Sequence, residues 1–294
     1  MSTDPALSPL QAFSAAAAAI VANAAPGLVA VHSHRSRASG FVWRPGLIVT
    51  SDESLAEEGE ITVTTPGGQV AQAALVGRDP TTDLALLRIE AKDIAPLTLS
   101  AAGPGAGEIA VVVGSHAGHP VAALGVAALV GPAWRSMRGG EIAARIELDV
   151  RLRRSSEGGL ALDAAGHAFG MAVFGPRRRV LVIPSATIER VATRLESHGR
   201  IARGYLGLGL QTVRLASGGV GAMVMSVDAA GPGAAAGVRQ GDVIAAWNGQ
   251  PIRGVQAIVR ALGPASVGSI VALSVQRGGE PVEASVTIAE RPEA

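Results

Sequence analysis

Histidine and the acidic side chains must supply any metal-binding or acid–base chemistry in this chain, because it contains no cysteine. Without cysteine there is no disulfide, no thiolate nucleophile and no cysteine-ligated zinc or iron–sulfur site. His32 and His34 alternate along a predicted strand, so their side chains would share one face and could clamp a transition metal. The neighbouring sequence offers no third ligand. We therefore expect no metal site and no cofactor, and name His32 and His34 as the residues that would hold a metal if one were bound.

Arginines form two short runs, Arg151 to Arg154 and Arg177 to Arg179. The chain as a whole is nearly neutral, with a net charge of +1, so any charge-driven partner must use a local patch. Only eight residues are aromatic, and none lies between these arginines, so we expect no nucleic-acid partner. Two interpretations stay open: the runs bind an acidic segment of a partner, or they are solvated loops.

The composition is that of a folded protein with more than one domain. The chain has 294 residues, of which 48% are hydrophobic and 17% charged, with 38 glycines and 17 prolines. This length suggests two domains, and the composition indicates compact units with many turns rather than a disordered chain.

The N-terminal segment, residues 1–25, carries few charges. No Asp, Glu, Lys or Arg occurs between Pro5 and His34, but a signal peptide would begin with basic residues, and only Asp4 is charged at the start. Ser8, Pro9 and Gln11 form a capping-box pattern that predicts a helix. Its apolar residues would share one face: Leu10, Phe13, Ala17, Ile20, Val21 and Ala24. We therefore expect a docking helix, no membrane partner and a cytoplasmic rather than periplasmic protein.

Short β-branched runs separated by turn residues follow, which is typical of an all-β sandwich or barrel. The predicted strands are Leu28–Val31, Gly40–Trp43, Leu47–Thr50, Ile61–Thr64, Leu84–Ile89, Ile109–Val113, Ile142–Leu148, Leu160–Leu162, Phe169–Val173 and Val180–Ile183. Ser185 is expected to cap a helix over Ala186–Ser197, which Gly199 ends.

A second, smaller unit is predicted after a linker at residues 200–204. Its expected strands are Tyr205–Leu210, Ala222–Val227, Val243–Trp247 and Ile270–Gln276, with a helix over Val255–Leu262. The predicted organisation is thus a first domain over residues 26–199 and a second over residues 205–290.

The order of several motifs resembles the HtrA-type proteases, which pair a trypsin-like domain with a PDZ domain. The motifs of the first domain are Gly40–Val42, Ile48–Thr50, Gly77–Ala85 and Ile183–Ser185. Those of the second domain are Arg203–Leu208, Gly231–Gly237 and Gly241–Ile244. The resemblance implies a mainly β fold: a trypsin-like double β-barrel followed by a smaller PDZ-like α+β domain.

The resemblance also implies where a catalytic triad would lie. Asp83 matches the aspartate that orients the histidine, but Glu53 stands at the histidine position and Glu157 at the serine position. Ser155 replaces a glycine whose backbone helps to form the oxyanion hole. A serine protease needs an imidazole base and a hydroxyl nucleophile. These substitutions favour a non-catalytic, protein-binding or scaffolding subunit, with no catalytic residues expected at Glu53, Asp83 and Glu157.

Alternatives to the inactive-subunit interpretation remain open at this stage. The chain could be a hydrolase that uses a relocated hydroxyl, Ser155 or Ser156, or a metal ion held by the acidic cluster. The paired acids could also perform acid–base chemistry, or the cleft could simply have become solvated.

For the PDZ-like domain, the resemblance implies capture of a protein or peptide, with a free C-terminus added beside its second strand. The carboxylate-binding loop would be Tyr205, Leu206, Gly207 and Leu208, and the facing helix would offer Val255, Ile258, Val259 and Leu262. The resemblance further places both arginine runs at the rim of the first domain's cleft, where an acidic segment could bind. Oligomerisation is compatible with these features.

Overall fold

The computed structural model describes residues 8–91, 93–215 and 218–292. The chain divides into two compact units. The first holds the chain up to residue 134 together with residues 141–200, and the second holds residues 135–140 and the chain from residue 201. Each unit is described by itself.

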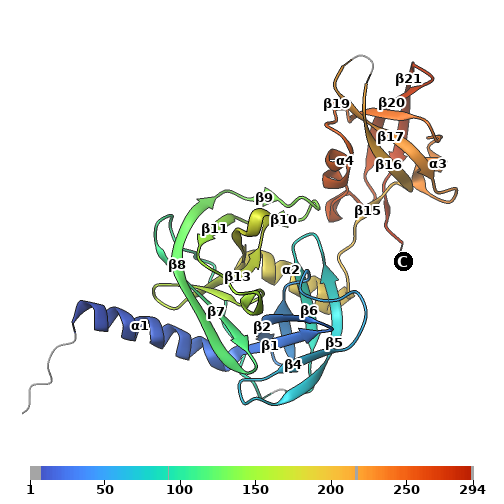
Figure 1. Cartoon of the computed structure of the whole chain (residues 1–294). Coiled ribbons are helices and arrows are strands. Elements are labelled where there is room, and N and C mark those ends of the chain that lie inside the picture. Colours follow the sequence, from blue (N-terminus) through green and yellow to red (C-terminus); the bar gives the residue numbers. More distant parts are fainter. Residues whose placement is uncertain (1–7, 92, 216–217, 293–294) are drawn as a thin grey trace, which may run out of the picture. The chain divides into compact units, whose positions relative to one another are not determined.

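Six antiparallel strands close into the first barrel of the first unit (Figure 1). They are β1 (Leu28–Ser33), β2 (Ser36–Arg44), β3 (Leu47–Thr50), β4 (Ile61–Thr64), β5 (Val70–Asp79) and β6 (Leu84–Arg88). Their order around the barrel is β1-β2-β3-β6-β5-β4. Aliphatic side chains that include Val29, Val42, Ile48 and Leu87 fill the interior. These β-branched and leucine residues pack well on a pleated, half-buried surface.

A second closed barrel completes the double barrel that the resemblance implied. It contains β7 (Ile109–His116), β8 (His119–Gly131), β11 (Arg145–Asp149), β12 (Leu160–Asp163), β13 (Ala168–Phe174) and β14 (Val180–Pro184). The order is β11-β14-β13-β12-β7-β8. Its core includes Val112, Ile146, Phe169 and Val182. The short strands β9 (Trp134–Arg135) and β10 (Glu141–Ile142) lie between β8 and β11 in the sequence.

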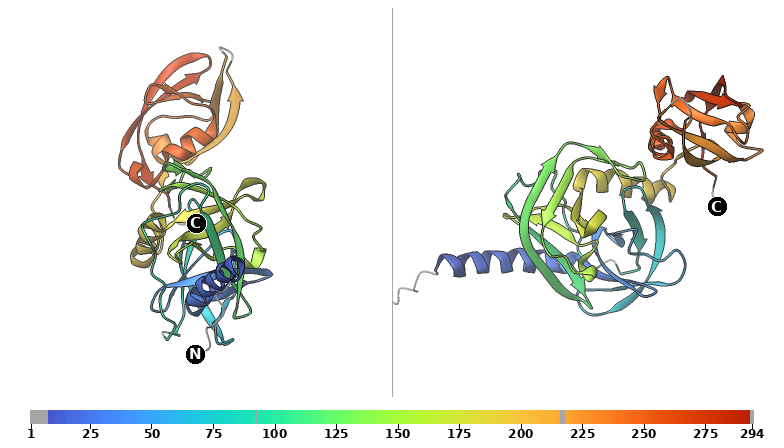
Figure 2. Two further views of the ribbon diagram at one scale, coloured as in Figure 1. Left: turned by 90° about the vertical axis from the view of Figure 1, so that its left-hand side faces the viewer. Right: turned by 45° about the horizontal axis from the view of Figure 1, so that its top comes forward.

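Two α-helices flank the barrels in the sequence. Helix α1 (Pro9–Ala24) begins at the predicted capping box, in which Ser8 and Gln11 exchange hydrogen bonds. Ala24 is its only buried residue, and Leu10 and Phe13 of the expected docking face are exposed. Figures 1 and 2 show that most of the helix extends away from the barrels. Helix α2 (Ser185–His198) buries Ile188, Val191 and Leu195 on one stripe.

The structure corrects two local predictions. Ser185 is the first residue of α2 and makes no capping hydrogen bond, because Pro184 occupies the cap position. His34 lies in the turn after β1, with a φ of 51°, so it does not share a strand face with His32. The helix end is as expected: Gly199 adopts the left-handed conformation that glycine accepts without strain.

The second unit is built on a six-stranded sheet. The strands are β16 (Leu208–Arg214), β17 (Val220–Val227), β18 (Val243–Trp247), β20 (Ile270–Arg277) and β21 (Glu280–Thr287), with β19 (Gln250–Pro251) paired to β18. Strands β15 (Gly204–Tyr205) and β22 (Ala289–Glu290) form a separate pair. Helices α3 (Pro232–Ala235) and α4 (Val255–Ala261) complete the unit. The predicted α+β organisation of this unit is present, with Leu206, Ile244 and Leu273 in its core.

Candidate functional site

Asp83 is held at the end of a tight turn between β5 and β6. The carboxylate of Asp79 accepts hydrogen bonds from the backbone N–H of Thr81 at 3.0 Å and from the hydroxyls of Thr81 and Thr82, both at 2.7 Å. An aspartate that bonds to the backbone two residues on is a usual way to form such a turn. The turn leaves Asp83 with a φ of 56°, at the start of β6 and partly exposed.

The loop after β3 carries Glu53 and is tied to β5 by an ion pair. The Nε of Arg78 lies 2.5 Å from the carboxylate of Asp52, which is almost fully buried. A second guanidinium nitrogen of Arg78 donates to the Asp52 carbonyl at 3.3 Å. The hydroxyl of Ser54 donates to the Ser51 carbonyl at 2.7 Å. These bonds fix the loop next to the Asp83 turn.

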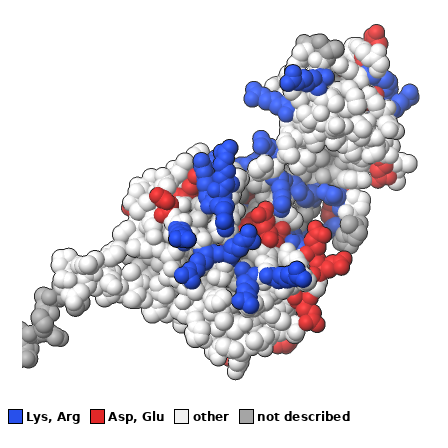
Figure 3. Space-filling model, in the orientation of Figure 1, with Lys and Arg blue, Asp and Glu red and all other residues white. Residues whose placement is uncertain are grey.

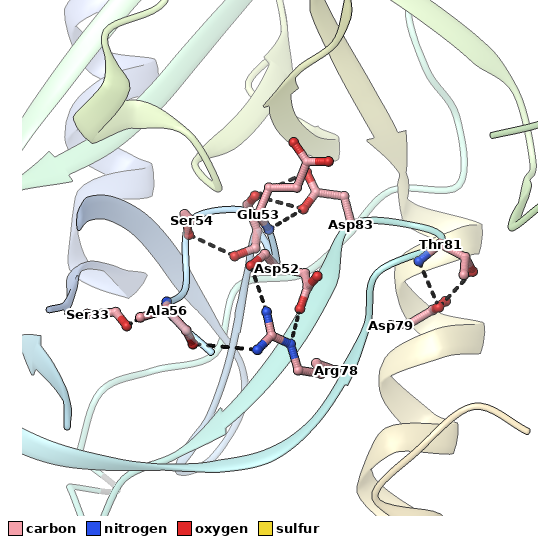
Figure 4. Close-up of polar contacts among 10 residues, drawn as sticks. Ser33, Asp52, Glu53, Ser54, Ala56, Arg78, Asp79, Thr81 and Asp83 are labelled. Atoms are coloured by element: carbon pink, nitrogen blue, oxygen red, sulfur yellow. Dashed lines mark hydrogen bonds and ion pairs between the residues drawn. The ribbon is translucent and has the colours of Figure 1, made fainter. Parts of the chain in front are cut away.

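Asp83 receives two donors from this loop (Figure 4). The hydroxyl of Ser51 lies 2.9 and 3.0 Å from the two carboxylate oxygens, and the backbone N–H of Glu53 donates to Asp83 Oδ1 at 2.8 Å. The carboxyl groups of Glu53 and Asp83 lie side by side in the figure. Among the described residues, no histidine, lysine or arginine pairs with Asp83.

Glu157 enters the same cluster from the second barrel. It follows the 3-10 turn η2 (Arg154–Ser156), and its carbonyl accepts the backbone N–H of Ser39 at 2.7 Å. Its Oε1 accepts the backbone N–H of Phe174 at 3.4 Å. The next residue must be glycine: Gly158 has a φ of 81°, and a Cβ there would lie 2.3 Å from the Ser39 carbonyl oxygen.

The electrostatics of the cluster favour proton uptake. Removal of the Asp83 carboxyl from water raises its pKa to about 7, from an ordinary value of 3.8. The hydrogen bonds from Glu53 and Ser51 oppose this shift, and the nearby charges of Glu53 and Glu157 add to it. Burial likewise raises the pKa of Glu157, against the Phe174 hydrogen bond and the charge of Arg154, while the charge of Glu53 adds to the rise. Asp83 is therefore about half protonated near pH 7.

The hydroxyls proposed as relocated nucleophiles have no base beside them. Ser156 is buried, Ser155 is half-buried, and no described hydrogen bond joins either hydroxyl to a histidine or a carboxylate. Ser51 does contact Asp83, but it is fully buried. An acyl-transfer site also needs free backbone N–H groups for the oxyanion. Here the N–H of Glu157 already donates to the Arg154 carbonyl at 3.1 Å.

The histidines and acids do not form a metal site in the part of the chain that the structure describes. No group of three or more His, Asp or Glu side chains there has the arrangement that a metal ion needs. His32 sits on β1, and burial together with Arg37 and His116 lowers its pKa. His34 is in the following turn, so the pair that the sequence suggested is not brought together on one face.

In the second unit, the predicted carboxylate loop joins β15 to β16. Gly207 has a φ of 71°, and a Cβ there would lie 2.9 Å from the Cα of Gly231. The carbonyls of Leu206 and Gly207 accept from Gly233 and Asp228. The hydroxyl of Tyr205 donates to Asp228 at 2.9 Å. These contacts hold the loop in one shape.

The eight residues predicted to bind peptide divide by burial. Leu206 and Ile258 are buried in the core of the second unit. Leu208, Val255, Val259 and Leu262 are half-buried, so a bound chain could reach them. The backbone N–H of Val255 donates to Thr212 at 3.1 Å, which fastens the start of α4 to β16. Strand β16 is at one end of the strand order, so its outer edge can accept an added strand.

The sequence interpretation missed Ser51 and the Asp52–Arg78 pair that orient Glu53 and Asp83. Ser51 and Asp52 directly follow the predicted strand Leu47–Thr50, which was the available signal. Arg78 lies far from them in the sequence, and nothing local connects it to Asp52.

Comparison with known proteins agrees with this architecture. Residues 38–171 match the trypsin-like peptidase domain, and residues 204–288 match the PDZ domain. A probable periplasmic serine endoprotease DegP-like from Brucella suis biovar 1 (strain 1330) is 31% identical over 274 residues, which cover 87% of this chain and 53% of the relative. A protein of the same name from Chlamydia trachomatis serovar D (strain ATCC VR-885 / DSM 19411 / UW-3/Cx) is 31% identical over 272 residues, covering 87% and 54%. The chain thus spans about half the length of these curated relatives.

Solved structures show the same fold. The serine endoprotease from Yersinia pestis superposes with a TM-score of 0.70 at 24% identity, over 94% of this chain and 98% of that chain. A variant of the HtrA-type protease AlgW with a tripeptide superposes with a TM-score of 0.68 at 26% identity, over 94% and 97%. The predicted double barrel followed by a PDZ domain is confirmed.

The comparisons contradict two other predictions. The interpretation as a non-catalytic scaffolding subunit is wrong, because the relatives are named serine endoproteases and HtrA-type proteases, which agrees with the alternative of a hydrolase. The expected cytoplasmic location is also wrong, because the relatives are named periplasmic. The apolar segment Pro9–Gly27 is long and hydrophobic enough to cross a membrane, and such a segment near the N-terminus is compatible with a signal sequence.

The matched segments lie on the two units that the fold defines. The trypsin-like match falls on the double barrel that carries the acidic cluster, and the PDZ match falls on the sheet bordered by β16. The relatives resemble the chain across both units. The chain therefore combines an HtrA-type trypsin-like serine protease domain with a PDZ domain.

Proposed function

We propose that this chain is a polypeptide hydrolase of the periplasm, in which the PDZ domain binds an extended polypeptide and the acidic cluster of the double barrel cleaves it. The observation that carries the proposal is the convergence of Glu53, Asp83 and Glu157, with the pKa of Asp83 raised to about 7. The names of the relatives and the apolar N-terminal segment support the location.

Carboxyl groups, rather than a serine and a histidine, would perform the chemistry. Glutamates at positions 53 and 157 offer neither an imidazole nor a hydroxyl. Neighbouring carboxyls that cannot all ionise instead provide one base and one acid in the same site. With Asp83 half protonated near pH 7, both forms are available at neutral pH.

The hydrolytic step balances with water as the only co-reactant. An ionised carboxylate of the cluster takes a proton from water while the water oxygen bonds to the amide carbon. The carbon–nitrogen bond then breaks, and the leaving nitrogen takes its proton from the protonated carboxyl. The cluster as a whole returns to one acid and one base after the product amine and acid depart.

The PDZ domain supplies the binding part of the proposal. Strand β16 offers an open edge, and the half-buried Leu208, Val255 and Leu262 offer apolar contacts beside it. An added strand gains main-chain hydrogen bonds along that edge. The AlgW variant was solved with a tripeptide. The similarity of this chain to that relative supports peptide binding here.

The test is cleavage of fluorescently labelled, unfolded casein by the purified chain. We expect turnover that survives both a chelator and a serine-directed fluorophosphonate. Glu157→Gln and Asp83→Asn should each lower kcat/KM by at least about 100-fold, because each removes a proton-transfer group. Glu58→Gln, an exposed acid in the loop beyond Glu53, serves as the matched control and should keep full activity.

Two outcomes would overturn the proposal. Covalent labelling by the fluorophosphonate with loss of turnover would assign the chemistry to a serine. Absence of cleavage at every pH, by a protein that still binds peptide, would remove the hydrolase function.

A further inference from the structure

Two loops of the second barrel carry six exposed arginines close to Glu157. One loop, with Arg151, Arg153 and Arg154, leads into η2, and the other, with Arg177, Arg178 and Arg179, surrounds the 3-10 turn η3 (Pro176–Arg178). In Figure 3, basic side chains gather over one face of the first unit. The two loops are far apart in the sequence, so the fold must bring them together.

Hydrogen bonds join the segment that follows η2 to strand β13, and the two arginine-bearing loops extend from these two segments. Gly158 donates to the Ala172 carbonyl at 2.8 Å, and Ala172 donates to the Gly159 carbonyl at 2.8 Å. One step further, the N–H of Phe174 reaches the Glu157 carboxylate at 3.4 Å. Both arginine-bearing segments therefore begin near Glu157: Arg154 is three residues before Glu157, and Arg177 is three residues after Phe174. We call these six residues the arginine rim.

The fold neutralises only one arginine of the rim. The guanidinium of Arg179 lies 3.1 Å from the Glu147 carboxylate, which Arg145 also contacts. Within the described residues, no ion pair joins Arg151, Arg153, Arg154, Arg177 or Arg178 to an acid. Arg178 lies over the Phe174 ring, 5.9 Å from its centroid, and Arg154 interacts electrostatically with Glu157. Apart from Arg154, whose charge already acts on Glu157, four arginines of the rim therefore remain available on a chain whose net charge is +1.

The chemistry of the rim selects carboxylates. Arginine presents a planar fork of donors that matches a carboxylate with two parallel hydrogen bonds. Single-stranded nucleic acid would also need aromatic faces on which bases stack, and no aromatic residue lies between the rim arginines in either run. An acidic polypeptide is the partner that these observations fit.

We propose that the arginine rim binds an Asp- or Glu-rich segment of the polypeptide that reaches the acidic cluster, so that the preferred substrates are acidic on one side of the cleaved bond. This inference rests on the proposed function, because it names the substrate class of the same site. It also makes a prediction about binding alone, which is independent of catalysis.

The test compares two synthetic peptides of equal length that differ only in Glu against Gln at alternate positions. Both carry a C-terminal amide, so that they offer no free carboxylate to the PDZ domain. Binding is measured by fluorescence anisotropy at low and high salt, and mass spectrometry verifies that the peptides stay intact. We expect the acidic peptide to bind at least about tenfold more tightly at low salt, with the difference shrinking as salt is added.

Charge-matched variants locate the effect. In the triple variant Arg151→Gln, Arg153→Gln and Arg177→Gln, the preference for the acidic peptide should disappear. The control triple variant, Arg35→Gln, Arg88→Gln and Arg253→Gln, removes the same charge from exposed arginines elsewhere and should keep it. Circular dichroism verifies that both variants fold.

Several outcomes would overturn the inference: equal affinity for the two peptides, equal losses in the two triple variants, or tighter binding of an oligouridylate than of the acidic peptide. Failure of the proposed function would look different. Acidic binding without cleavage would contradict only the hydrolase, whereas cleavage without an acidic preference would contradict only the arginine rim.

Discussion

Two aspartates, one in each unit, occupy opposite electrostatic surroundings. Asp242 in the second unit is buried, and Arg277 holds both of its oxygens at 2.9 and 2.8 Å. This pairing lowers its pKa, mainly through the Arg277 hydrogen bonds. Asp83 in the first unit faces a hydroxyl, a backbone N–H and other acids, and its pKa is raised to about 7. The same type of side chain is a structural anchor in one unit and has a pKa near neutral pH in the other.

The contrast shows how a site can be separated from a scaffold within one chain. Asp52 in the first unit resembles Asp242, since it is almost fully buried against Arg78. Arginines thus lie beside the two aspartates that hold loops in place, Asp52 and Asp242, and no described ion pair joins an arginine to Asp83. Acids beside one another are destabilising for the folded state, which is a usual feature of functional sites.

The largest effect on stability is expected from Asp242→Ala. The substitution removes the acceptor of Arg277 and of the Arg239 N–H, which bonds at 2.9 Å. Breaking this buried pair should lower the unfolding free energy of the second unit by about 3 kcal/mol, as measured by urea denaturation. Because the pKa of Asp242 is lowered, the wild-type second unit should also lose stability as the pH falls below about 4. Glu283→Ala, at an exposed position on β21, is the control, and an equal loss there would contradict the contrast.

Asp83→Asn should instead change how the free energy of unfolding depends on pH. Because its pKa is raised, Asp83 binds more protons in the folded than in the unfolded chain between about pH 4 and 7. The free energy of unfolding therefore decreases as the pH rises through that range. The neutral asparagine should remove this dependence. In wild type we expect it to amount to on the order of 2 kcal/mol between pH 5 and pH 8, because water that reaches part of the carboxyl reduces the effect of burial. Denaturation midpoints at the two pH values measure it. Parallel profiles for wild type and variant would refute the raised pKa.

A smaller effect on stability is expected when two alanine substitutions are compared, one at a glycine in the PDZ loop, Gly207, and one at a glycine in an ordinary turn, Gly237. Gly207 and Gly237 both have positive φ values, 71° and 77°, but a Cβ at Gly207 would meet Gly231 at 2.9 Å, whereas one at Gly237 would meet nothing within 4 Å. Gly207→Ala should therefore cost about 1 kcal/mol more than Gly237→Ala in thermal or urea unfolding. Equal costs would show that the loop is not held in the shape described.

Sequence patterns predicted the fold where β-branched runs were bounded by turns. The strands Leu47–Thr50, Ile61–Thr64 and Val243–Trp247 have the predicted bounds because their residues are apolar throughout or alternate cleanly. Strands β5, β8 and β21 were not predicted. Much of β8 is exposed and rich in Ala and Gly, so its local strand signal is weak and its pairing depends on partners elsewhere in the chain. Strand β21 alternates polar and apolar residues, which was an available strand signal that the sequence analysis did not use.

The candidate site was predictable only in part. Motif order indicated that Glu53, Asp83 and Glu157 meet, although they are separated by more than a hundred residues. Burial raises the pKa values of Asp83 and Glu157, and Ser51, Phe174 and Arg154, which oppose the rise, come together with these two acids only in the folded barrels. The metal-binding hypothesis for His32 and His34 assumed a continuous strand, and the turn at His34 ends it.

The pH profile of kcat/KM for cleavage of an unfolded polypeptide tests the central claim most directly. Catalysis by the acidic cluster predicts that activity falls as the pH rises through about 7, where Asp83 loses its proton, and that Asp83→Asn abolishes that limb together with most of the turnover. Activity that instead rises through pH 7 and survives in Asp83→Asn, or no activity at any pH, would contradict the account.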